Sequence, residues 1–166
     1  MPRASDERRE RGRPLIGVGA VVLSDELDRV LLIRRAAPPS VGKWSVPGGL
    51  VERGEALIDA CSRELSEETG VGADLRPDPV KLIERLLLGP DGLPRYHYLI
   101  VDFWGRDRGG APRPGDDVDR AEWIEIDRLG GLDTTAGLRG VVERAARIAR
   151  GEPPGSPLLE LISTPV

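Results

Sequence analysis

Apolar residues occur along the chain in short runs separated by Gly, Pro and charged residues. Residues 16–23 are almost continuously apolar and β-branched, and residues 29–35 resume the pattern after a polar turn, so both segments are predicted to be buried strands. Residues 80–88 and 95–105 flank a Gly-Pro-Asp-Gly turn and predict a hairpin. A last short strand is predicted over residues 121–126.

Two segments have helical periodicity. Residues 56–69 contain no Gly or Pro and are followed by Gly70, a residue that favours the end of a helix. Residues 138–150 repeat apolar residues at helical spacing and predict a second amphipathic helix. Two helices and about six strands predict an α/β domain of the α/β/α sandwich type, in which helices cover a mixed β-sheet.

The two ends of the chain differ in composition from its middle. Residues 1–13 are dense in Arg and Glu and predict a disordered or loosely attached arm. Residues 151–166 are rich in Pro and are expected to form a tail over the surface or against a partner subunit, which leaves residues 14–150 as the folded domain. Four apolar residues of that tail either cover a second copy in a homodimer or fold back on their own domain: Leu158, Leu159, Leu161 and Ile162.

Composition narrows the class of protein. A chain of 166 residues with 39% hydrophobic content suits one globular domain. The formal net charge of −4 gives no support for a nucleic-acid-binding surface, and no apolar run is long enough to predict a membrane span. Cys61 is the only cysteine, so no intrachain disulfide forms and a cytoplasmic location is expected. Its place on the apolar side of a helix predicts a core residue.

The first predicted helix carries an unfavourable group of acids. Glu64, Glu67 and Glu68 fall within an arc of roughly 100°. They lie near the C-terminal end, where the helix dipole disfavours anions, and like charges three and four residues apart cost roughly 0.2–0.5 kcal/mol per pair. The solvent-facing side of the helix is elsewhere, so a solvated charge run explains these acids poorly. Oxygen ligands clustered in this way suit Mg²⁺ or Mn²⁺.

Residues 49–71 resemble the Nudix box. Its pattern is Gly, five residues, Glu, seven residues, Arg-Glu, an aliphatic residue, any residue, Glu-Glu, any residue, Gly and an aliphatic residue. Every specified position is filled at that spacing, by Gly49, Glu55, Arg63, Glu64, Leu65, Glu67, Glu68, Gly70 and Val71. The Trp-Ser-Val-Pro-Gly run over residues 44–48 looks like the usual lead-in. The resemblance implies a Nudix hydrolase with the sandwich fold and a divalent metal cofactor.

The resemblance also implies roles for the residues of the box. Glu55 and Arg63 would orient the carboxylates, because a guanidinium offers a fixed fork of donors, although a plain salt bridge between loop and helix fits them equally. The implied metal ligands are the backbone carbonyl of Gly48 and the side chains of Glu64, Glu67 and Glu68.

The general base has two candidate places in such enzymes. One is the box itself, where Glu64 or Glu67 can take the proton of the attacking water. The other is the acid-rich loop ahead of Trp123, in which Asp117 stands nearest the usual acidic position. The family pattern has Glu there, one methylene longer, and a solvated acidic loop is an equally good interpretation of Asp117.

Other residues are weaker candidates for substrate binding. Trp44 can stack on a base or ribose, or can simply pack beside the Gly-rich loop. Arg34 and Arg35, at the end of a predicted strand, can bind phosphate or can be ordinary surface residues. His97, the lone histidine, is expected to be structural.

The expected reaction is hydrolysis of the pyrophosphate linkage in a nucleoside diphosphate derivative, a small-molecule nucleotide. The Arg34-Arg35 strand end, the Pro-bearing loop and the residues before the box resemble enzymes that act on ADP-ribose. However, the proline that many of these carry after the box is replaced by Leu86 and Leu87. The alternatives are removal of oxidised nucleoside triphosphates such as 8-oxo-dGTP, and a nucleotide-sensing domain without catalysis, which the complete box disfavours.

Overall fold

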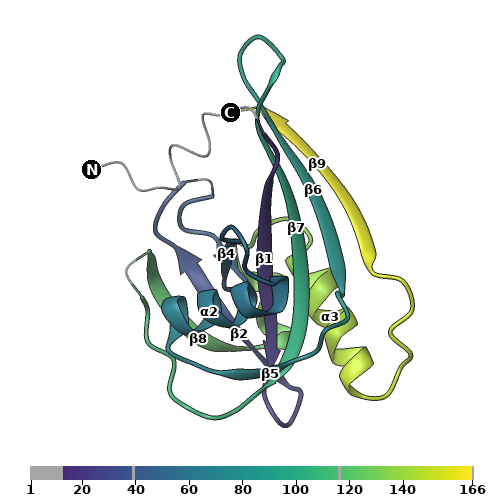
Figure 1. Cartoon of the computed structure of the whole chain (residues 1–166). Helices are drawn as coiled ribbons and strands as arrows, with labels where there is room; N and C mark the ends of the chain where they lie inside the picture. The colour runs from purple at the N-terminus through teal and green to yellow at the C-terminus, as the bar shows by residue number, and fades with distance from the viewer. Residues whose placement is uncertain (1–12, 39, 116, 166) are drawn as a thin grey trace.

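The computed structural model describes residues 13–38, 40–115 and 117–165, so residues 1–12 of the predicted arm lie outside it. The chain forms one curled, mixed sheet with helices on both sides (Figure 1). In chain order the elements are β1 (Leu15–Leu23), β2 (Arg29–Arg35), β3 (Trp44–Ser45), β4 (Gly48–Leu50), α2 (Leu57–Thr69), β5 (Ala73–Leu75), β6 (Lys81–Leu88), β7 (Pro94–Asp107), β8 (Val118–Glu125), the 3₁₀ helix η1 (Ile126–Gly131), α3 (Leu138–Ala149) and β9 (Leu158–Pro165).

The central strand β1 connects the two halves of the sheet. The strand order is β3-β2-β1-β7-β6-β9, while β4 also pairs with β1, β5 with β7, and β8 with β2. β1 runs parallel to β7 over its whole length, whereas β6 and β7 form the predicted antiparallel hairpin. Neither helix in the described ranges is long and apolar enough to cross a membrane.

Both faces of β1 are buried, which explains why its sequence is almost continuously apolar. Val18, Ala20 and Val22 belong to a core cluster with Ala60, Cys61 and Leu65 of α2. Val21 and Leu23 belong to a second cluster with Val141, Val142 and Ala145 of α3. The sheet therefore lies between α2 and α3, which confirms the predicted α/β/α sandwich (Figure 1).

Cys61 is a core residue, as its place on the helix predicts. Its side chain is fully buried, and the thiol donates a hydrogen bond to the carbonyl of Gly19 at 3.4 Å. Burial raises the pKa of this thiol to about 12, so it stays protonated and unreactive at neutral pH.

The C-terminal segment differs from the expected tail. Residues 158–165 form β9, which runs parallel to β6 from the Lys81–Leu158 pair to the Leu88–Pro165 pair. The apolar residues near the end therefore fold back on their own sheet, although Leu159 remains 78% exposed. The prolines lie before the strand and at its last position, so they do not interrupt it. The high proline content of residues 151–166 therefore favoured a tail, although residues 158–165 form a strand with alternating burial.

The short strands β3, β4 and β5 were also not expected from the sequence. They have only two or three residues each, and pairing with β1, β2 and β7 defines them rather than any local pattern. In contrast, α2 ends where the sequence predicts. Gly70 adopts a left-handed conformation (φ 68°) and donates its backbone N–H to the Ser66 carbonyl at 2.8 Å.

The junction before α3 gives a test of this packing. Gly137 has φ +72°, and a Cβ there would overlap the Lys81 side chain, so Gly137→Ala is expected to destabilise the protein by about 1–3 kcal/mol. Gly140 lies inside α3 with open space around it, so Gly140→Ala is expected to stabilise by about 0.5–1 kcal/mol. Urea unfolding of both variants measures these effects. A change in the free energy of unfolding with the same sign in both variants would contradict this packing.

Candidate active site

The loop before α2 is held against the acidic end of that helix by β4. Gly48 and Gly49 pair with Gly19 and Val18 of β1. The backbone N–H of Gly48 donates a hydrogen bond to the carboxylate of Glu68 at 2.8 Å. A Cβ at Gly49 would overlap the Glu64 carboxylate, and one at Gly48 would overlap the Val18 carbonyl. Two glycines are therefore required for the loop to lie so close to both the sheet and the carboxylates.

Arg63 organises the acids around it. Its Nε and Nη2 donate to the two carboxylate oxygens of Glu55 at 2.8 and 3.0 Å, and its Nη1 donates to Glu64 at 2.7 Å. Nη2 also donates to the carbonyl of Leu50 at 3.1 Å, while Glu67 lies 3.5 Å from Nη1. The bond from Arg63 lowers the pKa of Glu55 to about 2, so this acid stays ionised. Arg63 and Glu55 thus form a loop-to-helix salt bridge that also fixes Glu64.

Glu64 and Glu68 are half-buried, and their electrostatics differ from those of Glu55. Burial raises the pKa of Glu64 above its ordinary value. Burial also raises the pKa of Glu68 to about 7, because removal from water outweighs the bond from Gly48 and the nearby charges of Glu64 and Asp117 add to the shift. Arg63 balances only part of the charge on Glu64, because it is shared with Glu55, and the oxygens of Glu64 and Glu68 are the donors that a hard divalent ion prefers.

These donors are not already arranged as a complete metal centre. In the described ranges, no group of three or more Asp, Glu, His or Cys side chains is placed to hold a metal ion. The reason is visible in the hydrogen bonds, since Arg63 takes one oxygen of Glu64 and the Gly48 N–H takes one oxygen of Glu68. The side chain of Glu67 is 61% exposed, and its carboxylate lies 3.5 Å from Nη1 of Arg63. The carboxylate oxygens therefore suit a divalent cation, but the positive charge that now lies nearest to Glu64 is the guanidinium of Arg63.

A long loop places Asp117 beside this site. The backbone N–H groups of Arg113 and Gly115 donate to the last carbonyls of α2, at Thr69 (2.8 Å) and Glu68 (2.9 Å). A Cβ at Gly115 would overlap the Glu67 carbonyl, so the loop lies directly on the helix end. Asp117 lies two residues after Gly115, and its charge contributes to the raised pKa of Glu68. The fold thus brings Asp117 and the acids of α2 together.

The predicted substrate-binding residues have different surroundings. Arg34 donates from Nε and Nη2 to the carboxylate of Asp119 at 2.9 and 2.6 Å, so its charge is already balanced. Arg35 lines the cavity described below, and its charge acts on Glu68. Trp44 is only 8% exposed and belongs to the core cluster under α3, so the packing interpretation describes it and stacking on a ligand does not.

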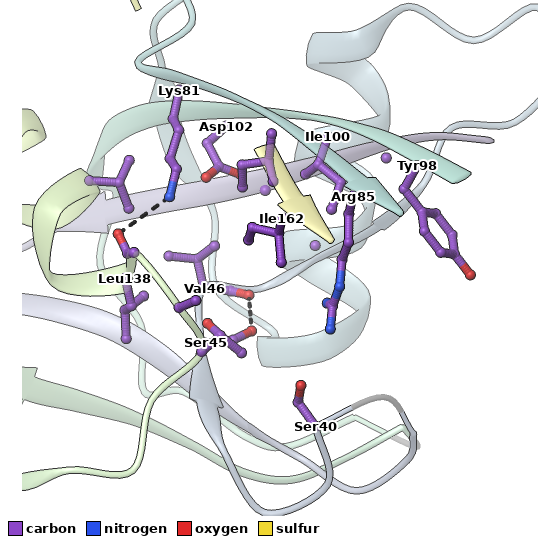
Figure 2. A pocket seen from close by; sticks show the side chains of 18 of the residues that line it. Ser40, Ser45, Val46, Lys81, Arg85, Tyr98, Ile100, Asp102, Leu138 and Ile162 are labelled. Atoms are coloured by element: carbon purple, nitrogen blue, oxygen red, sulfur yellow. Dashed lines mark hydrogen bonds between the residues drawn. The ribbon is translucent and has the colours of Figure 1, made fainter. Parts of the chain in front are cut away.

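A cavity of about 410 Å³ opens beside the two glycines of the box (Figure 2). Its floor is one face of β1, β7, β6 and β9, and its other walls come from the chain around β3 and from the start of α3. Among the described residues that line it, four are basic and one is acidic: Arg35, Lys43, Lys81, Arg85 and Asp102. The sequence reasoning missed the last three, although each is a charge that interrupts an apolar strand.

Comparisons with known proteins find a matching family and several similar sequences. A family model described as "NUDIX domain" matches residues 13–145. The chain is 35% identical over 116 residues to an ADP-ribose pyrophosphatase of Methanocaldococcus jannaschii, a match that covers 70% of this chain and 64% of that protein. It is 32% identical over 147 residues to the NAD-capped RNA hydrolase NudC of Stutzerimonas stutzeri, covering 84% and 49%. The chain thus spans less than two thirds of each relative.

A solved structure has the same fold. The NUDIX domain of Shewanella oneidensis NrtR, complexed with ADP ribose, superposes with a TM-score of 0.66 at 19% identity, covering 90% of this chain and 99% of that one. At this identity the likeness establishes the fold alone.

The raised pKa of Glu68 predicts a pH-dependent stability. A carboxyl that binds its proton more tightly when folded makes the folded state less stable as pH rises from its ordinary pKa of 4.5 through about 7. Glu68→Gln removes this titration and keeps an acceptor for the Gly48 N–H. With a chelator present, the unfolding free energy of this variant minus that of the natural protein is expected to grow by about 1–3 kcal/mol between pH 4 and 8. A constant difference in urea unfolding would contradict the burial of this charge.

The position of Asp117 predicts a catalytic effect. If Asp117 takes the proton of the attacking water, Asp117→Asn lowers kcat by about 10²–10⁴-fold and leaves KM nearly unchanged. Asp74→Asn is a suitable control. Asp74 is an exposed acid on β5 that pairs with Arg108, and it does not line the cavity. A loss in kcat below about tenfold would exclude Asp117 as the base.

Proposed function

Because the chain belongs to the NUDIX domain family, we propose that it is a metal-dependent pyrophosphohydrolase of nucleoside diphosphate derivatives, with ADP-ribose the favoured substrate. The observation that carries the proposal is the cavity that begins at Gly48 and Gly49 and bears four basic side chains. The acidic end of α2 adjoins the same two glycines. A site for divalent cations thus borders a site for an anionic ligand.

The charge of the cavity suits a polyphosphate. The whole chain has a formal net charge of −4, yet basic side chains outnumber acidic ones in the cavity lining. Arg35 and Lys43 line the cavity and would supply donors for phosphate oxygens, although Lys43 also lies 3.4 Å from Asp133. The volume of about 410 Å³ lies within the usual range of small-molecule sites.

Glu64, Glu67, Glu68 and the carbonyl of Gly48 are the groups that would hold the metal. When bound, a divalent cation would balance the diphosphate charge and make the attacking water more acidic. Burial raises the pKa of Glu64 and of Glu68, so a cation at this place would favour their ionised forms. Arg63, which also binds Glu55, fixes Glu64 beside Gly49, one of the residues that line the cavity.

The chain's own residues also account for proton transfer. Asp117 lies beside Glu68 on a loop that is bonded to the end of α2, so its carboxylate is held near the place of the reacting water. We assign the general base to Asp117, and Glu67, exposed on the neighbouring turn, is the second candidate.

The choice of ADP-ribose rests on the relative from Methanocaldococcus jannaschii, which is named an ADP-ribose pyrophosphatase. The triphosphate alternative and the sensor alternative predict different outcomes in one assay. Release of AMP and ribose 5-phosphate supports the favoured substrate. Release of pyrophosphate from 8-oxo-dGTP supports the triphosphate alternative, and nucleotide binding without products supports the sensor.

Removal of the box carboxylates tests the proposal. Glu64→Gln and Glu68→Gln are each expected to lower kcat for ADP-ribose, with Mg²⁺ or Mn²⁺ present, by at least about 100-fold, because a lost metal ligand removes several kcal/mol of transition-state stabilisation. Products are identified by mass, with and without a chelator. Asp59→Asn is the matched control, since Asp59 is an exposed acid on the same helix. Unchanged turnover in both Gln variants, or full activity in chelator, would overturn the proposal.

A further inference from the structure

One straight row of residues crosses the floor of the cavity. Gly48 on β4 pairs with Gly19 on β1, Gly19 pairs with Asp102 on β7, and Asp102 pairs with Lys81 on β6. Neighbouring strands lie about 4.8 Å apart, so Asp102 stands about 10 Å from Gly48. A ribose and a base can bridge this span when the diphosphate lies at the box. Asp102 is therefore within reach of the nucleoside part of such a substrate.

Asp102 is buried and has an oxygen acceptor to offer. The residue is 3% exposed and lines the cavity, in which it is the sole acidic side chain among the described residues. In the described part of the chain, no donor forms a hydrogen bond to its carboxylate. A Cβ at Gly19 would overlap the carboxylate, so the glycine on the adjacent strand makes room for it. Buried carboxylates normally have a partner, and here the open side is the cavity.

Lys81 and Glu160 hold Asp102 in this environment. Lys81 is 3% exposed, forms an ion pair with Glu160 of β9, and lies 3.5 Å from the carbonyl of Gly137. This pairing leaves Asp102 as the net negative charge of the group. Burial raises the pKa of Asp102 to about 6, which leaves the carboxylate mainly ionised at pH 7.5. An ionised carboxylate accepts hydrogen bonds and donates none.

The two ends of the cavity floor have different chemistry (Figure 2). Asp102 and Lys81 lie at one end and Arg85 and Tyr98 at the other, with Ile100 between them. The Nε of Arg85 is buried without a hydrogen-bond partner, so this end can receive a negatively charged or polar group. Asp102 repels phosphate, so its end suits an uncharged ring that rests on the apolar floor and presents a donor.

We propose that Asp102 accepts a hydrogen bond from the exocyclic amino group of the substrate's nucleobase and thereby selects amino-bearing bases over bases with a carbonyl at that place. This proposal rests on the proposed function, because it identifies which nucleotides the same site takes. Adenine and guanine both carry such an amino group, at C6 and at C2. A carbonyl oxygen at that place would face the carboxylate without a proton between them, which is repulsive.

Nucleoside monophosphates provide the test, because IMP lacks the amino group of both AMP and GMP. Calorimetric titration of the natural protein is expected to show AMP or GMP binding at least about tenfold more tightly than IMP, as a hydrogen bond to a charged group predicts. The amide of Asp102→Asn can donate to the carbonyl at C6 of IMP, so this variant is expected to bind IMP as tightly as AMP, and a preference for GMP over IMP is expected to weaken because the charged acceptor is lost. Glu84→Gln is the control, since Glu84 lies on the other face of β6 and contacts His97. It should keep the natural preference.

The outcomes separate this proposal from the proposed function. A preference for AMP identifies the amino group at C6, and a preference for GMP identifies the one at C2. IMP binding within about threefold of both in the natural protein would overturn base selection, and hydrolysis of ADP-ribose would still stand. A preference that survives in Asp102→Asn would overturn the role of Asp102, and Asp102→Ser gives the same test if the first variant does not fold. No binding of any of the three would overturn base selection by Asp102, while the ADP-ribose assay decides the proposed function separately.

Discussion

The site depends on one guanidinium that is shared among several acids. Arg63 binds both oxygens of Glu55, one oxygen of Glu64 and the carbonyl of Leu50, so it joins the loop before α2 to the helix itself. A planar fork of donors can do this, whereas a lysine ammonium cannot reach the same set. The bonds keep Glu55 ionised and hold Glu64 in a half-buried position that it would otherwise leave for water. The unfavourable group of acids is thus partly balanced before any metal binds.

The scaffold for this arrangement is β1. Its apolar side chains support both helices, while Gly17 and Gly19 leave open the face on which the cavity lies. The same strand pairs with β4 on one side and β7 on the other, so it holds the acidic loop and the cavity floor in fixed register. The strand β4, which contacts the acids of α2, and the floor of the proposed base site are therefore parts of one sheet, and their separation is set by strand spacing.

Local pattern was sufficient for much of the structure. The helix that carries the acids, its end at Gly70 and the hairpin of β6 and β7 all follow from periodicity and turn residues. The spacing of the box acids also predicts that they share one side of α2. The approach of Asp117 to Glu68 could be predicted only through the family resemblance, because backbone bonds between the loop and the helix end create it.

Other features depended on tertiary contacts that no local pattern contains. Trp44 packs in the core because β3 joins β2, and β9 forms because β6 offers it an edge. Asp102 and Lys81 come into one row with Gly48 through strand pairing alone, since they are far apart in the sequence. The only local signal for these residues was a charged side chain inside an otherwise apolar strand. That signal indicates a site only when the strand register shows that the charged side chains lie on the same face of the sheet.

The bonds between the loop and the end of α2 have one more consequence. Gly115 and Arg113 are tied to the final carbonyls of the helix, and Glu68 stands on that same final turn. Helix termini fray at a lower free energy than the core opens. Fraying of this turn would detach an acid of the proposed metal site and release the Asp117 loop in one event. The proposed turnover would then be lost on mild heating while most of the sheet remained intact.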